Sequence, residues 1–143
     1  MFILYTKVVR INSVGGQILL AFAAAFVIKI FVVDFIITEG NSMLPVIENG
    51  RVLIVNRLAY GIKPPFASIY AVRWAVPQKG DIVVFWTPYG NLAVKRCAEV
   101  IAAAEAGNGN FFARGDNSAE SFDSRSYGPV PQDNIIGKVL GIK

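Results

Sequence analysis

Histidine is absent from the 143-residue sequence, and cysteine occurs once, as Cys97. Without histidine the chain cannot build a Ser-His-Asp triad. A single cysteine excludes an internal disulfide, and the two absences together exclude a Cys/His zinc site. The acidic residues Asp116, Glu120 and Asp123 do not have the spacing of a calcium-binding loop, so we expect neither a metal ion nor another cofactor.

Charged residues are also scarce, at 17% of the chain, whereas 54% of the residues are hydrophobic. Nucleic-acid binding needs a basic face with many phosphate contacts, and the net charge of +4 does not indicate one. We therefore expect no nucleic-acid partner. The length is enough for one domain and not comfortably for two, and we expect a monomer.

What the sequence does have is a long apolar segment near its N-terminus. No charged residue occurs between positions 11 and 28, and Lys29 can extend its ammonium group outward from such a segment. A helix over residues 12–32 would be roughly 30 Å long, which is the thickness of a bilayer core. A buried helix of a soluble core usually has a polar face, and this segment offers only Gln17. We therefore expect a transmembrane helix.

A cleavable signal peptide is the closest alternative for this segment. The apolar run continues past its alanines as far as Ile37, which favours an uncleaved anchor. Lys7 and Arg10 precede the run, so the positive-inside rule places residues 1–11 in the cytoplasm. Residues 33–143 then form an extracytoplasmic domain, anchored by a single pass through the plasma (inner) membrane and in contact with its lipid.

The rest of the chain consists of short β-favouring runs separated by turns. The sequence predicts strands at residues 35–38, 52–55, 82–86, 92–101, 111–113 and 135–142. Glycine and proline at positions 59–74 indicate an irregular segment or a hairpin arm, and residues 115–126 read as a polar loop. The predicted fold is therefore mainly β, a compact all-β domain of coiled antiparallel sheets preceded by one N-terminal transmembrane helix.

Ser42 and Lys95 are the candidate reactive residues. Ser42 lies in the turn Gly-Asn-Ser-Met-Leu-Pro directly after the apolar run, although most turn serines bond only to nearby backbone. In a strand, Lys95 shares a face with Ala93 and Cys97, where desolvation lowers the pKa of the amine. A neutral amine can take the proton of a serine hydroxyl. A solvated lysine beside Arg96 is the alternative.

Four segments in order resemble the type I signal peptidases, a family of membrane-bound Ser/Lys peptidases that remove signal peptides from exported proteins. The segments are residues 40–45, residues 51–63, residues 79–85 with 94–96, and residues 115–117 with 121–125. With the N-terminal anchor they cover nearly the whole chain. Each segment alone is a moderate signal, and the ordered set is a strong one.

The resemblance implies roles for individual residues. Ser42 is the expected nucleophile and Lys95 its general base, with an acyl-enzyme as intermediate. Ser121 is expected to hydrogen-bond the Lys95 amine and to orient it. Asp123 and Arg125 are expected to form a structural ion pair that holds the loop of Ser121.

The resemblance also implies how a preprotein binds. An extended peptide is expected to add as a strand beside residues 36–39 and beside the Lys95 strand. Small pockets would accept the two alanines of an Ala-x-Ala type cleavage signal, and Ile36, Thr38 and Val94 are the candidates to line them. The apolar residues 35–37 are candidates for resting on the lipid surface.

Two departures from the family concern the oxyanion hole and the size of the domain. Gly40 stands where some members carry a serine that donates to the oxyanion, and many other members have glycine there. The family's segment after the base is replaced by the short residues 97–109, so we expect no large second subdomain. A peptidase specialised for one substrate class, a catalytically silent scaffold and a soluble self-cleaving repressor are the alternatives, and the anchor argues against the last.

Overall fold

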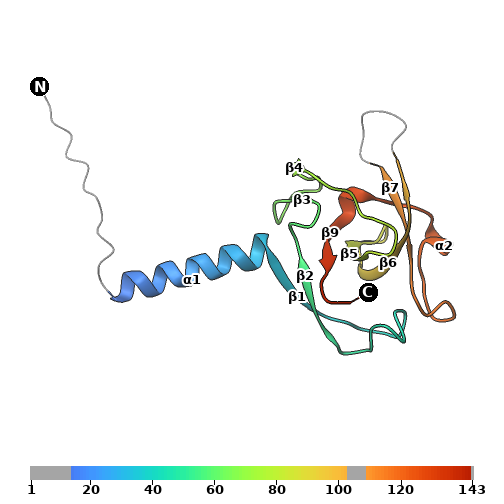
Figure 1. Ribbon diagram of the computed structural model, residues 1–143, viewed down its shortest axis with the longest axis horizontal. Coiled ribbons are helices and arrows are strands. Elements are labelled where there is room, and N and C mark those ends of the chain that lie inside the picture. The colour runs from blue at the N-terminus through green and yellow to red at the C-terminus, as the bar shows by residue number, and fades with distance from the viewer. Residues whose placement is uncertain (1–13, 103–108, 143) are drawn as a thin grey trace, which may run out of the picture.

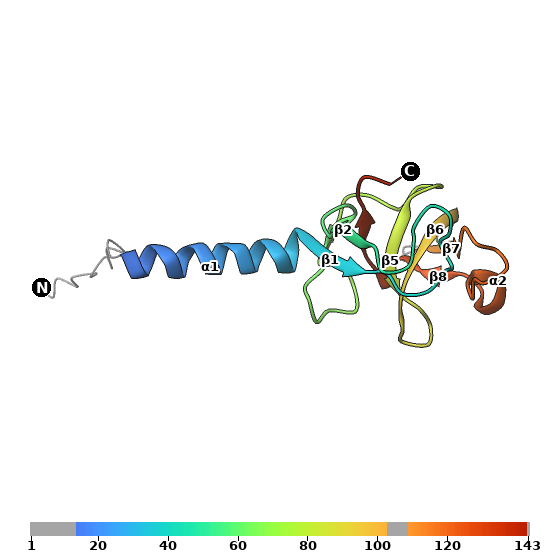
Figure 2. The ribbon, with the colours of Figure 1, turned by 90° about the horizontal axis from the view of Figure 1, so that it is seen from below.

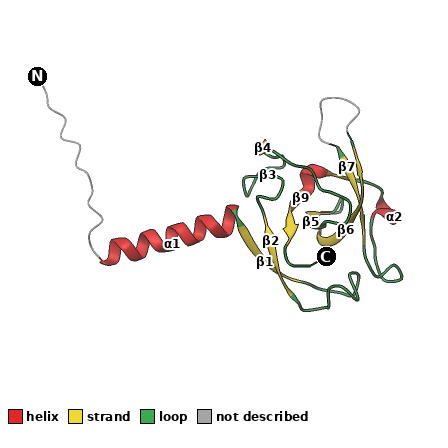
Figure 3. Cartoon of the chain, in the orientation of Figure 1, coloured by secondary structure: helices red, strands yellow, loops and turns green. Residues whose placement is uncertain are grey.

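The structure is a computed structural model that describes residues 14–102 and 109–142. One long helix stands apart from a domain built mainly of strands (Figure 1, Figure 3). The helices are α1 (Val14–Phe31), α2 (Ser124–Tyr127) and the 3-10 helix η1 (Gln132–Asn134). The strands are β1 (Val33–Ile37), β2 (Val52–Asn56), β3 (Gly61–Ile62), β4 (Val72–Arg73), β5 (Ile82–Trp86), β6 (Leu92–Ile101), β7 (Asn110–Arg114), β8 (Val130–Pro131) and β9 (Ile135–Val139).

Helix α1 has no buried residue along its 18 positions and projects away from the domain (Figure 2). It is long and apolar enough to cross a membrane. A core helix of a soluble domain buries at least one face, so the buried-core alternative is excluded for this segment. Helix α1 lies within the expected segment 12–32, whereas residues 12 and 13 and the expected cytoplasmic segment 1–11 lie outside the described residues.

Seven strands form one antiparallel sheet in the order β1-β2-β9-β5-β6-β7-β8, and the sheet curls into a half-barrel (Figure 1). This confirms the mainly β fold. The predicted strands are all present, and β9 ends at Val139, three residues before the predicted end. The segment 59–74 forms the hairpin arm that carries β3 and β4.

Both faces of the sheet are covered at β5, where one hydrophobic cluster packs on each face. Val83 and Phe85 pack on one face with Phe111, whose ring meets Phe85 edge-on at 5.2 Å between centroids. Ile82 and Val84 pack on the other face. This explains why β5 is buried at four successive positions and shows no apolar–polar alternation.

The predicted polar loop 115–126 contains one helical turn that the sequence prediction missed. Helix α2 begins after Asp123, whose carboxylate accepts a hydrogen bond from the Arg125 backbone N–H at 3.1 Å. An aspartate at this position satisfies an N–H group that the helix itself leaves unpaired. A helix of four residues is too short to show an apolar period, which is why the pattern gave no sign of it.

Candidate active site

The turn that carries Ser42 is held at both ends by buried groups. Thr38, at the end of β1, is buried and donates its hydroxyl to the Glu48 carbonyl at 2.8 Å. On the other side of Ser42, Met43 and Ile47 lie in the cluster that covers one face of the sheet, with 4% and 1% of their surfaces exposed. The Ser42 hydroxyl is therefore presented from a backbone that is fixed to the core.

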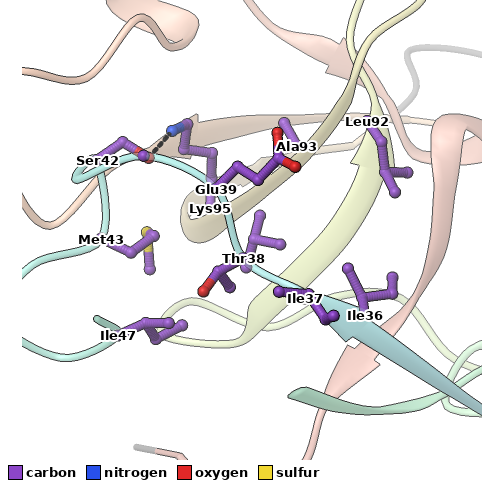
Figure 4. Close-up of a pocket in the computed structure, with 12 residues that line it drawn as sticks. Ile36, Ile37, Thr38, Glu39, Ser42, Met43, Ile47, Leu92, Ala93 and Lys95 are labelled. Atoms are coloured by element: carbon purple, nitrogen blue, oxygen red, sulfur yellow. Dashed lines mark hydrogen bonds between the residues drawn. The ribbon is translucent and has the colours of Figure 1, made fainter. Parts of the chain in front are cut away.

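Lys95 reaches Ser42 from the middle of the sheet. It lies on β6, is only 6% exposed, and its Nζ is 2.5 Å from Ser42 Oγ, a hydrogen bond drawn in Figure 4. Burial lowers the pKa of the Lys95 amine from its ordinary value, the Asp123 carboxylate acts in the opposite direction, and Arg125 lowers the pKa further. A serine hydroxyl and a desolvated amine at hydrogen-bond distance can exchange a proton, which is what general-base activation of a nucleophile requires.

Asp123 is the most heavily bonded polar residue of the site. Its side chain is fully buried and accepts hydrogen bonds from the Gly115 N–H at 2.8 Å and from the Ser121 hydroxyl at 2.7 Å. Arg125 closes an ion pair with the same carboxylate through Nε and Nη2, each at 2.8 Å. These contacts tie the loop 115–125 into a single unit behind Lys95.

Ser121 differs from the expectation in its partner. Its hydroxyl donates to Asp123, and within residues 14–102 and 109–142 no hydrogen bond joins it to Lys95. A carboxylate is a stronger acceptor than an amine, which accounts for the choice of partner. In this structure the Ser121 hydroxyl therefore binds the Asp123 carboxylate and not the Lys95 amine.

Replacing Asp123 with asparagine should destabilise the protein by about 2 kcal/mol or more, because hydrogen bonds to a buried charge are lost or weakened. Burial raises the pKa of Asp123, but its bonds to Arg125, Gly115 and Ser121 outweigh burial and hold the pKa far below its ordinary value of 3.8. A depressed pKa contributes stability above the unfolded-state pKa, and that contribution is lost as the pH falls through the folded-state pKa.

Urea unfolding of wild type and Asp123→Asn at pH 7 and at pH 2.5 checks this prediction. The difference in the free energy of unfolding should be large at pH 7 and smaller at pH 2.5. An equal difference at both pH values would contradict the role given to the ionised carboxylate.

Gly115 lies between Ser42 and Ser121 where no side chain has room. A Cβ at this position would come within 2.1 Å of Ser121 Oγ and 2.5 Å of the Ser42 carbonyl oxygen. The next two residues bind the turn of Ser42 and the strand of Lys95. The Asn117 backbone N–H donates to the Ser42 carbonyl at 3.0 Å, and Asp116 accepts two hydrogen bonds of 2.8 Å from Arg96.

Replacing Gly115 with alanine should lower kcat for peptide cleavage by about 100-fold, since a misplacement of about 1 Å at a catalytic group has a cost of that order. The matched control is Gly15→Ala, where the added Cβ meets nothing within 4 Å. Steady-state kinetics on a peptide substrate measures both variants. Cleavage by Gly115→Ala at the wild-type rate would show that this close approach does not set the geometry of Ser42.

Gly115, Asp116 and Asn117 belong to a segment that carries the resemblance, but their contacts are not apparent from the sequence. Their contacts join residues that are far apart in the chain, 20 positions in the case of Arg96 and Asp116. Strand and helix periods describe only local neighbours, so no such pattern could have found these pairs.

A cleft of about 360 Å³ opens beside Ser42 and Lys95, between the end of β1 and the start of β6 (Figure 4). Its lining includes Ile36, Thr38 and Val94, the three residues expected to contact substrate, together with Gly40. The structure therefore brings Gly40, Ser42, Lys95 and these three residues to one cleft, with Ser121, Asp123 and Arg125 behind Lys95.

The two strands beside the cleft each have an unpaired edge. β1 is an outer strand of the sheet and pairs only with β2. On β6, pairing with β7 begins at Arg96, so within the described chain residues 92–95 pair with β5 alone. An extended peptide in the cleft would have backbone partners on both sides.

Among the described residues, no three His, Cys, Asp or Glu side chains are grouped closely enough to hold a metal ion. The cleft offers the Ser42 hydroxyl, the buried Lys95 amine and the exposed Glu39 carboxylate. A serine activated by an amine is the pair that a serine hydrolase needs when it has no histidine.

Comparisons with known proteins also indicate a hydrolase, and they identify its family. The family model described as "Signal peptidase, peptidase S26" matches residues 11–104 and 93–142. Since these ranges cover most of the sequence, the chain belongs to the signal peptidase family, peptidase S26. The N-terminal apolar helix is in keeping with this family of membrane-anchored peptidases.

Three relatives show how far the similarity extends. The chain is 28% identical to signal peptidase I of Bacillus caldolyticus, over 78% of this chain and 80% of that protein. It is 26% identical to probable signal peptidase I-1 of Synechocystis sp., over 86% and 77%. It is 34% identical to signal peptidase I of Buchnera aphidicola subsp. Schizaphis graminum, over 50% of this chain and only 23% of that longer relative.

Proposed function

We propose that the chain is a signal peptidase I, an anchored endopeptidase that cuts the signal peptide from exported preproteins after an Ala-x-Ala type site. The observation that carries the proposal is the 2.5 Å contact between Lys95 Nζ and Ser42 Oγ at the end of a cleft with two unpaired strand edges. Family membership and the absence of histidine support the same chemistry.

In the proposed mechanism the Ser42 oxygen attacks the scissile carbonyl while its proton passes to Lys95 Nζ. The tetrahedral oxyanion collapses, the C–N bond breaks, and the Lys95 ammonium protonates the leaving amine. The signal peptide then remains as an ester on Ser42. Lys95 next takes a proton from water, which attacks the ester, and returns that proton to the Ser42 oxygen.

The backbone N–H of Ser42 is the proposed oxyanion donor. Within residues 14–102 and 109–142 no hydrogen bond engages this N–H, whereas the Ser42 carbonyl is held by Asn117 at 3.0 Å. A preorganised backbone N–H can then stabilise the charge that develops on the substrate oxygen. Gly40 lines the same cleft and has no side-chain donor to add.

We propose that the substrate adds as a strand between β1 and residues 92–95 of β6. Ile36, Thr38 and Val94 would then line the pockets for the two small side chains of the cleavage signal. Pockets bounded by apolar side chains on a rigid sheet exclude larger residues by overlap. Specificity for alanine follows from this shape rather than from a charge.

We propose that α1 anchors the enzyme as a single transmembrane pass, with residues 1–11 in the cytoplasm and the β domain on the extracytoplasmic side. Phe35 and Ile37, which directly follow the helix on β1, are 61% and 65% exposed. They are proposed to rest on the lipid surface, where the apolar segment of a substrate is also held. This arrangement would bring the cleavage signal to Ser42 without removing the signal peptide from the bilayer.

The proposal is tested by incubating the full chain in detergent with a preprotein that carries an Ala-x-Ala site, and by measuring the masses of both products. We expect one cut, after the second alanine. A matched preprotein with tyrosine in place of that alanine should be cut at least about 100-fold more slowly, because a bulky side chain overpacks the pocket. No cleavage, or a cut at another bond, would reject the function.

A further inference from the structure

Two clefts meet at the junction between α1 and the domain, away from the active site. The smaller has a volume of about 190 Å³ and is lined by helix residues, among them Phe26 and Lys29, together with Arg57 and Pro65. The larger has a volume of about 500 Å³ and is lined by Arg57, Lys63, residues 64–68 and Trp86. They share Arg57 and Pro65 and so form one continuous surface, which we call the junction groove.

Backbone hydrogen bonds fix the level of this groove relative to the helix. The Arg57 N–H donates to the carbonyl of Val32, the first residue after α1, at 2.9 Å. In both ribbon views the segment that follows β3 lies beside the end of α1 (Figure 1, Figure 2). If α1 spans the bilayer, the groove lies at the level of the lipid headgroups on the side of the domain.

The groove brings positive charges together. Arg57 contacts Asp34 through Nη1 alone, at 3.1 Å, and in the part of the chain that the structure describes no hydrogen bond engages its Nε or Nη2. Lys63 donates to the Asp133 backbone carbonyl. Burial is the largest cause that lowers the pKa of Lys63, and the neighbouring Arg57 and Arg73 lower it further while Asp133 opposes them. A bound anion would offset this mutual repulsion.

The rim of the groove is apolar. Phe66 is 101% exposed, and Trp86, which lines the larger cleft, is 46% exposed. Pro64 and Pro65 restrict the backbone that presents Phe66. An exposed aromatic side chain beside cationic groups is typical of residues at a membrane–water interface, where one end is apolar and the other is hydrated.

We propose that the junction groove binds the phosphate of an anionic phospholipid between Arg57 and Lys63, with Phe66 inserted among the acyl chains. The lipid would fix the angle between α1 and the domain, and hence the height of Ser42 above the membrane. The proposal rests on α1 spanning the bilayer and not on the peptidase reaction.

To test the proposal, the full chain is placed in nanodiscs that contain equal amounts of phosphatidylglycerol and phosphatidylcholine. Native mass spectrometry then identifies the lipids that the protein retains when it is released from the nanodisc. Wild type should retain phosphatidylglycerol preferentially. Arg57→Gln and Lys63→Gln should each lower that preference about fivefold, the contribution of one cation at an anionic surface. Lys79→Gln, at an exposed lysine that lines a different cleft, is the matched control and should leave the preference unchanged.

Each remaining outcome supports or rejects the proposal. If wild type, Arg57→Gln and Lys63→Gln all retained phosphatidylglycerol equally, the proposal would be rejected. Displacement of the lipid by 10 mM inorganic phosphate would show a site for a free anion and reject a lipid. Phe66→Ser, which leaves both cations in place, should lower the retention of both lipids. Preprotein cleavage is measured separately, so failure of the groove and failure of the proposed peptidase function are distinguishable.

Discussion

Replacing Ser42 with alanine is expected to lower kcat for preprotein cleavage by about 10⁴-fold or more, the scale of losing the nucleophile of a serine hydrolase. The substitution removes the Oγ that lies 2.5 Å from Lys95 and leaves the buried Met43 and Ile47, so the turn should keep its position. A change confined to kcat would show that Ser42 takes part in bond making and not in substrate binding.

The matched control is Ser118→Ala, because Ser118 is an exposed serine in the loop that carries Ser121. This variant should cleave at the wild-type rate. Thermal unfolding of both variants verifies that they are folded. If Ser42→Ala retained activity within tenfold of wild type, another group would be the nucleophile and the proposed mechanism would be wrong.

Lys95 should also be essential, because of the neutral form of its amine rather than because of its charge. Lys95→Arg keeps a cation at the site, yet an arginine stays protonated throughout the working pH range, so the variant should lose activity by about 10³-fold or more. Lys95→Met keeps an unbranched side chain of similar length without any base, and it should be as inactive as the arginine variant. Cleavage rates of the two variants on one preprotein make the comparison.

The pH dependence of wild type gives a second measure of Lys95. Only the neutral amine can accept the Ser42 proton, so the rate should rise with pH through the pKa of Lys95. Because burial lowers that pKa from its ordinary value of 10.5, the rise should lie at lower pH than the titration of a free lysine. A rate that is flat with pH up to 10, or an active Lys95→Arg variant, would show that Lys95 is not the base.

Local patterns predicted the elements of the fold well. The charge-free run identified α1, and the β-favouring runs gave each strand of five or more residues close to its observed position. The alternation of side chains on β6 also held, since Ala93 and Cys97 pack in one cluster whereas Val94 packs in the other. These features depend on neighbours in sequence, which a single chain displays directly.

The candidate site could be predicted only in part. The pattern alone left Ser42 as one turn serine and Lys95 as one strand lysine, and it was the resemblance that linked them. Their contact joins residues 53 positions apart. The Ser121 hydroxyl donates to Asp123, the stronger acceptor, and only the folded loop brings the two groups into contact, so this bond could not be predicted from spacing.

The junction groove could not be predicted from the sequence for the same reason. Arg57 and Lys63 lie in a segment that read only as the end of a strand followed by a loop. The hydrogen bond from the Arg57 N–H to Val32 places Arg57 beside the end of α1, and Pro65 lines a cleft together with helix residues. Contacts between segments that are far apart in the chain produce no periodic pattern in the sequence.

The most direct test of the proposed mechanism is to quench a reaction of the full chain with preprotein in acid within its first turnover. The enzyme is then digested, and mass spectrometry determines which residue carries the acyl group. We expect the signal peptide, joined through its C-terminal carbonyl, on Ser42 and on no other residue. The ester should be absent from Ser42→Ala and from Lys95→Met. Acylation of a different residue, or cleavage without an acyl-enzyme, would contradict this mechanism.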